Sequence, residues 1–222
     1  MIDWSPLVVS LKTSIVATAL ALPPGLFAAR FVSGLRGRTR AIFDVAFTLP
    51  MLLPPTVLGF ILLSLLGRNG PIGGPLAALG IRIVFTWGGA VIAGAVVAFP
   101  LVYRTVRGAL EQIDPALAQA GRTLGLGEWT IFLKVHLPVA LPGTLAGLVL
   151  AYARVLGEFG ATVMLAGNIP GKTQTLPVAI YFAVEGDDYR RAVAWVCAIL
   201  AISLAMTVAL NAFGGKNHGH SR

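Results

Sequence analysis

The chain has 222 residues, of which 56% are hydrophobic and only 12% are charged, and its mean hydropathy is +0.82. This composition excludes a disordered protein and argues against a soluble globular domain, so we expect an integral membrane protein. The formal net charge of +8 is more typical of cytoplasmic loops in such a protein than of a nucleic-acid-binding surface. No nucleic-acid partner is therefore predicted.

Five apolar runs are long enough to cross a bilayer, which needs about 20 largely apolar residues per helix. To within several residues at each end, they lie at about 8–29, 41–66, 84–106, 139–165 and 190–213. Lys and Arg gather after the first, third and fifth runs, so the positive-inside rule places the N-terminus outside and the C-terminus in the cytoplasm. The sequence predicts an all-α multi-pass protein of the cell (inner) membrane with five transmembrane helices and a polar cytoplasmic tail at 214–222.

Prolines interrupt the second run at Pro50, Pro54 and Pro55. Each removes a backbone donor and bends the helix. Broken helices at membrane depth are tolerated only where protein or a water-lined cavity buries the freed carbonyl groups. We therefore expect the second run to face the bundle interior, with Pro54 and Pro55 lining a gate or, alternatively, acting only as kinks that shape packing.

A polar segment at 111–138 separates the third and fourth runs and is built like a docking helix. Asp114 is a candidate N-cap, and Pro115 stands at the first helical position, where its missing N–H costs nothing. Gly125 can take a positive φ and end the helix. Three residues between them carry almost no side chain, so one face could lie in a partner's groove; they are Ala118, Ala120 and Gly121. A surface helix that merely joins two spans is the alternative.

Two charged residues, Arg154 and Glu158, lie one helical turn apart inside the fourth run. An ionised residue near the bilayer centre costs about 2.5–3.5 kcal/mol on insertion scales, so neither should face lipid. Their spacing allows them to pair inside the bundle, and lining of a translocation pathway is the alternative interpretation. Gly157 and Gly160 allow close approach of a neighbouring helix.

Residues 166–173 are one residue short of a P-loop, because Ala166 stands at the first glycine position. A functional P-loop follows a strand and opens a helix, whereas this segment follows a membrane helix, contains Pro170 and is predicted to face outward. No nucleotide-binding, catalytic, cofactor or metal site is predicted. The protein is therefore expected not to be an enzyme and to depend on a partner for any ATP hydrolysis.

The loop at 111–138 resembles the cytoplasmic "EAA" loop of ABC-importer permeases, E-A-A-x-x-x-G, nine residues, I-x-L-P. Ala120, Gly121 and Gly125 match its first part and Val135-x-Leu137-Pro138 its end, but Gln119 replaces the glutamate and Gly121 the second alanine. In that family the loop docks on the ATP-hydrolysing subunit. The residues that the resemblance implies for this role are Asp114, Pro115, Ala118, Gln119, Ala120, Gly121, Gly125, Leu137 and Pro138.

Residues 157–177 resemble permeases that import tetrahedral oxyanions, above all molybdate ABC permeases. The G-E-F-G element at 157–160 is shared with sulfate and thiosulfate permeases, and N-I-P-G-x-T-x-T-x-P at 168–177 favours molybdate. The resemblance covers about 7–213 as one permease domain with a type I ABC importer fold.

This resemblance implies a homodimer of this permease with two cytoplasmic ATPase subunits, which use ATP, and an extracytoplasmic molybdate-binding protein. The alternatives are a sulfate, thiosulfate or tungstate permease and, more remotely, a non-transporting membrane scaffold or a passive channel.

Overall fold

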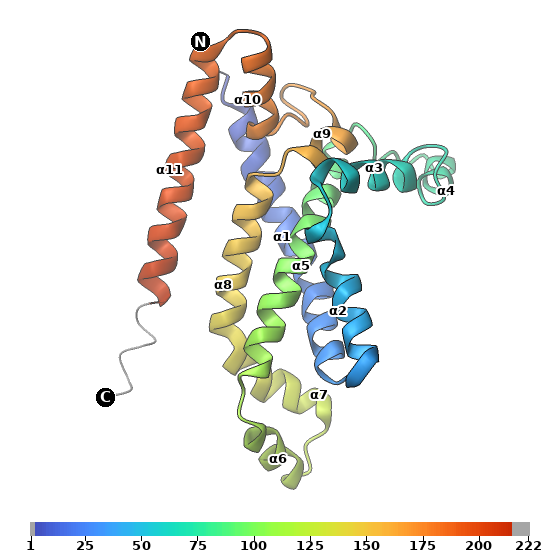
Figure 1. Cartoon of the computed structure of the whole chain (residues 1–222), viewed down its shortest axis with the longest axis vertical. Helices are drawn as coiled ribbons and strands as arrows, with labels where there is room; N and C mark the ends of the chain where they lie inside the picture. The colour runs from blue at the N-terminus through green and yellow to red at the C-terminus, as the bar shows by residue number, and fades with distance from the viewer. Residues whose placement is uncertain (1–2, 215–222) are drawn as a thin grey trace.

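The computed structural model describes residues 3–214, with side chains up to residue 208, so the expected tail at 214–222 lies almost wholly outside it. Every regular element in this part of the chain is helical (Figure 1). In chain order, the elements are α1 (Ser5–Ser33), α2 (Gly37–Leu52), α3 (Pro55–Leu66), α4 (Gly73–Ala78), α5 (Trp87–Glu111), α6 (Pro115–Thr123), α7 (Glu128–Ile131), the π-helix η1 (Phe132–His136), α8 (Leu137–Leu156), α9 (Gly160–Ala166), α10 (Leu176–Glu185) and α11 (Tyr189–Gly214).

Helix α5 forms the centre of the subunit and packs against both α1 and α8 (Figure 1). The three helices meet at Gly94, where an added Cβ would lie 2.7 Å from Val155 Cγ1 and 2.9 Å from Ala17 Cβ. One face of α5 is buried along most of its length and includes Tyr103, which is completely enclosed. Because lipid provides no hydrophobic force between helices, small residues that permit such close contact hold the bundle together.

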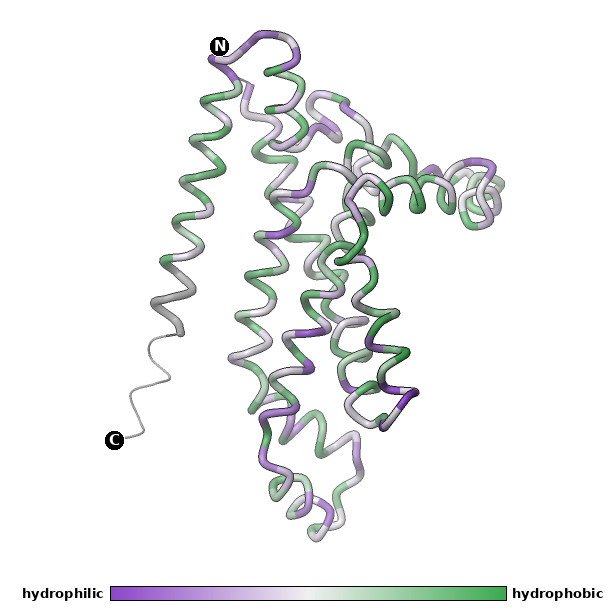
Figure 2. Tube along the Cα trace, viewed as in Figure 1, coloured by the Kyte–Doolittle hydropathy of each residue, from purple (hydrophilic) through white to green (hydrophobic). Residues whose placement is uncertain are grey.

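Four of the predicted spans are confirmed as helices long and apolar enough to cross a membrane: α1, α5, the continuous helical segment Glu128–Leu156, and α11. Figure 2 shows hydrophilic residues gathered at the two ends of the bundle, in the loop that carries α6 and around the turn between α10 and α11. The all-helical membrane fold expected from the sequence is therefore present.

The second span is not the continuous helix 41–66 that the hydropathy predicts. Helix α2 ends at Leu52, and α3 leaves it at an angle of 105°. Leu53 is extended (φ −74°, ψ 142°), as expected for a residue before proline, and Pro54 and Pro55 lack the N–H groups that would continue the helix. As a result, α3 turns sideways near one end of the bundle and leads outward to α4, instead of extending α2 (Figure 1).

The expectation that the second run faces the bundle interior is wrong for its first half, α2, whereas Leu58 and Leu62 of α3 are buried against α5 and α9. Helix α2 has no fully buried residue and lies at the edge of the bundle, against α5 and α1. Several of its apolar side chains are exposed, among them Val45 and Leu52. One subunit alone therefore leaves part of the apolar surface of α2 exposed.

The fourth span also differs from its predicted limits, 139–165. The helical segment begins earlier, at Glu128, and ends at Leu156. Gly157 terminates it, donating its N–H to Ala153 O at 3.3 Å, and a separate short helix, α9, begins at Gly160. The apolar run continues across this break, which is why hydropathy did not reveal it.

Candidate functional site

Helix α6 begins and ends with the local signals that the sequence predicts. Asp114 Oδ1 accepts a hydrogen bond from the Ala116 N–H at 2.8 Å, and Pro115 occupies the first helical position. After the helix, Gly125 has a φ of +75°, a conformation that favours glycine. The cap, the proline and the stop signal of the predicted docking helix are thus all confirmed.

The face of α6 expected to enter a partner's groove is instead used within the chain. Ala118 and Gly121 are buried, and an added Cβ on Gly121 would lie 3.0 Å from Ile131 Cγ1 in α7. The Leu126 N–H also donates to Gly121 O at 3.0 Å, folding the loop back onto the helix. Gly121 therefore lets α6 and α7 pack together, and neither it nor the buried Ala118 presents a free surface to a partner.

Other residues of α6 are exposed in the part of the chain that the structure describes. They are Leu117, Gln119 and Ala120, together with the strongly exposed Leu124 just beyond the helix. The sequence interpretation did not select the two leucines, although two apolar residues in a polar segment were a usable signal. Leu137 is partly buried and Pro138 exposed at the start of α8, so they close the loop without being part of the α6 surface.

Glu128 connects the loop to α1. Its Oε1 lies 2.6 Å from Arg122 Nε in α6, and its Oε2 lies 3.6 Å from Arg30 Nη2 near the end of α1. The hydrogen bond from Arg122 to Glu128 raises the pKa of Arg122. Since exposed ion pairs contribute little to stability, this cluster orients α6 more than it stabilises the fold.

The breaks in the second and fourth spans lie against each other. An added Cβ on Gly160 would lie 2.8 Å from Pro55 Cβ, and one on Gly59 would lie 2.9 Å from Ala161 Cα. Helices α3 and α9 thus touch backbone to backbone at two points. We call this pair the α3–α9 unit; it brings together Pro55 and Gly160, which the sequence interpretation treated separately.

Arg154 and Glu158 form the expected pair, with 2.7 Å between Arg154 Nη1 and Glu158 Oε2. The Glu158 side chain is only 2% exposed, and its other oxygen accepts a hydrogen bond from the Ala161 N–H at 2.9 Å. The Arg154 side chain remains 41% exposed. Glu158 therefore fixes the start of α9 and holds a partly exposed cation at the break in the fourth span.

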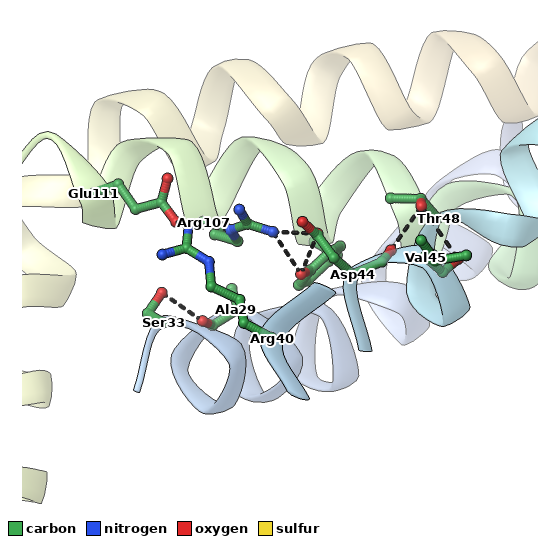
Figure 3. A network of polar contacts seen from close by, with 9 residues as sticks. Ala29, Ser33, Arg40, Asp44, Val45, Thr48, Arg107 and Glu111 are labelled. Carbon is green, nitrogen blue, oxygen red and sulfur yellow. Dashed lines mark hydrogen bonds and ion pairs between the residues drawn. The ribbon is translucent and has the colours of Figure 1, made fainter. Parts of the chain in front are cut away.

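A second charge cluster links α2 to α5, and the sequence interpretation missed it (Figure 3). Asp44 accepts a hydrogen bond from Tyr103 OH at 2.8 Å and is ion-paired with Arg107. Arg107 Nε also lies 2.8 Å from Glu111 Oε1, which pairs with Arg40. The available signal was Asp44 itself, an acidic residue inside a membrane-length apolar run.

A central bundle with two broken helices at one end and a polar double-helix loop at the other is the fold of type I ABC importer permeases. The fold matches a chain of the methionine ABC transporter MetNI in an inward-facing conformation, with a TM-score of 0.68, 18% identity, and coverage of 94% of each chain.

Residues 21–215 match the family of binding-protein-dependent transport system inner membrane components. The chain belongs to this family, and it is a multi-pass permease subunit of an inner-membrane ABC importer.

The chain is also similar to two permeases whose names give different cargoes. The chain is 44% identical to the molybdenum transport system permease protein ModB of Escherichia coli strain K12 over 205 residues, 92% of this chain and 89% of ModB. It is 37% identical to the sulfate transport system permease protein CysT of the same strain over 216 residues, 96% of this chain and 78% of CysT.

Proposed function

We propose that this chain is the permease subunit of a molybdate importer. The observation that carries the proposal is the 44% identity to a molybdenum permease along 92% of the chain. The motif at 168–177 points the same way. Sulfate import is the second candidate, because a sulfate permease aligns with 96% of the chain at 37% identity; thiosulfate and tungstate share the same tetrahedral shape.

The proposed assembly contains two copies of this permease, two ATPase subunits and an extracytoplasmic molybdate-binding protein. A second copy is supported by the large apolar surface that one subunit leaves uncovered, including α2 and most of α11. The loop carrying α6 would face the cytoplasm, because it lies at the same end of the bundle as the arginine-rich turn between α1 and α2 (Figure 1). ATP would be bound and hydrolysed by the partner alone.

Coupling would pass from the exposed face of α6 into the membrane. Closure of the ATPases would displace α6, and Glu128 would carry the movement to α1 through Arg30. The helical segment from Glu128 to Leu156 would carry it along the fourth span. At the end of that segment lies the α3–α9 unit, which would shift as one body because its backbones are in contact.

Within this proposal, a gate forms where the two broken spans meet. Its hinges are the breaks at Pro54 and Gly157, and its contact is that of Pro55 with Gly160. Arg154 provides a positive charge at the same level, and Glu158 limits its strength. A balanced pair suits a passage better than a binding site, because a dianion must leave as readily as it enters. Affinity for the cargo would reside in the binding protein.

The test is ATPase stimulation in the reconstituted assembly. The complete transporter in vesicles is given its binding protein loaded with molybdate, tungstate or sulfate, or left unloaded. We expect molybdate-loaded protein to stimulate ATP hydrolysis most. Stimulation by sulfate alone would establish the second candidate, and no stimulation by any oxyanion would favour a scaffold or a passive channel.

A further inference from the structure

A cavity of about 520 Å³ lies between the first turns of α1, the start of α5 and the loop before α10. It is at the end of the bundle opposite the α6 loop (Figure 1). Two cations, Lys12 and Lys172, line it together with hydroxyl and apolar groups, and no carboxylate of residues 3–208 does. Neither lysine forms an ion pair within the described residues, so the cavity carries uncompensated positive charge.

Lys12 is held in place by an aromatic side chain. Its Nζ lies 4.2 Å from the centroid of the Trp87 ring, a cation–π geometry. The Trp87 Nε1–H donates to Thr13 Oγ1 at 2.9 Å, and Thr13 is buried in α1. The ring is therefore fixed, and the ammonium group above it is positioned before any ligand arrives.

Lys172 is presented by a rigid turn. The Lys172 N–H donates to Ile169 O at 3.1 Å, with Pro170 and Gly171 between them and a Gly171 φ of +72°, as in a type II turn. Thr173 is completely buried, and its Oγ1 accepts a hydrogen bond from the Ile169 N–H at 3.1 Å. The segment that resembles a P-loop thus forms a stable turn that places a lysine beside the cavity.

The surroundings of Lys12 are those of a membrane interface. Val8 and Ile15 lie on the same face of α1, one turn to either side of Lys12, and are 63% and 59% exposed. Phe85 is likewise 61% exposed beside the cavity. Trp and Lys next to exposed aliphatic residues are typical of the level where lipid headgroups meet acyl chains.

We propose that Lys12 and Lys172 bind the phosphate of an anionic phospholipid, whose acyl chains lie along Val8 and Ile15. A free oxyanion offers the same charge, but it would gain nothing from this apolar flank. The proposal does not depend on which cargo the importer carries. It gives the end of the 166–173 segment, for which no nucleotide-binding role is predicted, a role in binding a lipid phosphate.

The test measures lipid retention by native mass spectrometry. The full-length chain, purified in detergent as the assembly in which it is expressed, is titrated with phosphatidylglycerol or with phosphatidylcholine bearing the same acyl chains. The variant is the double substitution Lys12→Ala and Lys172→Ala. The matched control, Arg68→Ala with Lys134→Ala, removes the same charge from exposed positions that do not line the cavity.

We expect the wild type and the control to retain phosphatidylglycerol in preference to phosphatidylcholine. The lysine variant should lose about thirty-fold in affinity for phosphatidylglycerol, because each lysine near an anionic surface contributes about fivefold. Equal retention of both lipids by the wild type, or equal loss in variant and control, would overturn the proposal.

Two further results would assign the cavity to a free oxyanion or to a protein partner. If millimolar phosphate or molybdate displaced phosphatidylglycerol, the site would be one for a free oxyanion and the lipid assignment would be wrong. If the variant kept its lipid but bound the extracytoplasmic binding protein more weakly, the lysines would instead be part of a protein-docking surface.

Discussion

The contact between Gly160 and Pro55 makes a sharp prediction about the α3–α9 unit. In a Gly160→Ala variant the new Cβ would lie 2.8 Å from Pro55 Cβ and 3.1 Å from both the Pro55 carbonyl carbon and Thr56 N. Two of these atoms belong to the backbone, so no side-chain rotation relieves the clash. Overpacking of this kind costs about 1–3 kcal/mol, which lowers the melting temperature of a chain this long by about 2–12 °C.

The matched control is Gly157→Ala, three residues earlier in the same break. The nearest atom to its added Cβ is Ala153 O at 3.9 Å, and its φ of −89° suits any residue. Thermal unfolding of the two purified variants in detergent, followed by tryptophan fluorescence, compares them directly. We expect a clear loss for Gly160→Ala and little change for Gly157→Ala; equal melting temperatures would refute the packing of α3 on α9.

Three further predictions concern the charges and the loop. Glu158→Leu should cost about 2–3 kcal/mol of stability, because the Ala161 N–H and Arg154 both lose their partner. Glu158→Gln keeps an acceptor for both groups, so in the same melting assay it should cost less than half as much. Asp44→Leu should raise proteolysis between α1 and α2, because α2 loses its contacts with Tyr103 and Arg107 of α5 and keeps only the Arg40–Glu111 ion pair. An unchanged digestion rate would mean that Asp44 does not hold α2 against α5. Leu124→Ser should weaken copurification of the ATPase while the melting temperature of the permease stays the same. Gly121→Trp should instead lower the melting temperature, because it disrupts the packing of α6 on α7. Full ATPase retention by Leu124→Ser would mean that docking uses another surface.

Features that depend on neighbouring residues were predictable from the sequence. Asp114, Pro115 and Gly125 define α6 through capping, a fixed φ and a positive φ, none of which needs another element. The pairing of Arg154 with Glu158 followed from their spacing on one helix and from the cost of isolated charges in lipid. Four membrane-spanning helices followed from hydropathy alone.

Features that depend on distant contacts were not predictable. Nothing local shows that Gly121 packs on Ile131 and is therefore closed to a partner. Asp44 and Arg107 are 63 positions apart, and the sequence offers no way to pair them. The break at Gly157 lies inside an apolar run, and it is stabilised by contact of α9 with Pro55 on another span. Hydropathy has no access to that contact.

The central claim, that this subunit serves a molybdate importer, is tested most directly by uptake. Proteoliposomes containing the permease and its ATPase partner, with ATP inside and the molybdate-loaded binding protein outside, are assayed for accumulation of radiolabelled molybdate. We predict ATP-dependent accumulation that a modest excess of sulfate does not suppress. Accumulation of sulfate but not molybdate, or equal entry without ATP, would contradict the account.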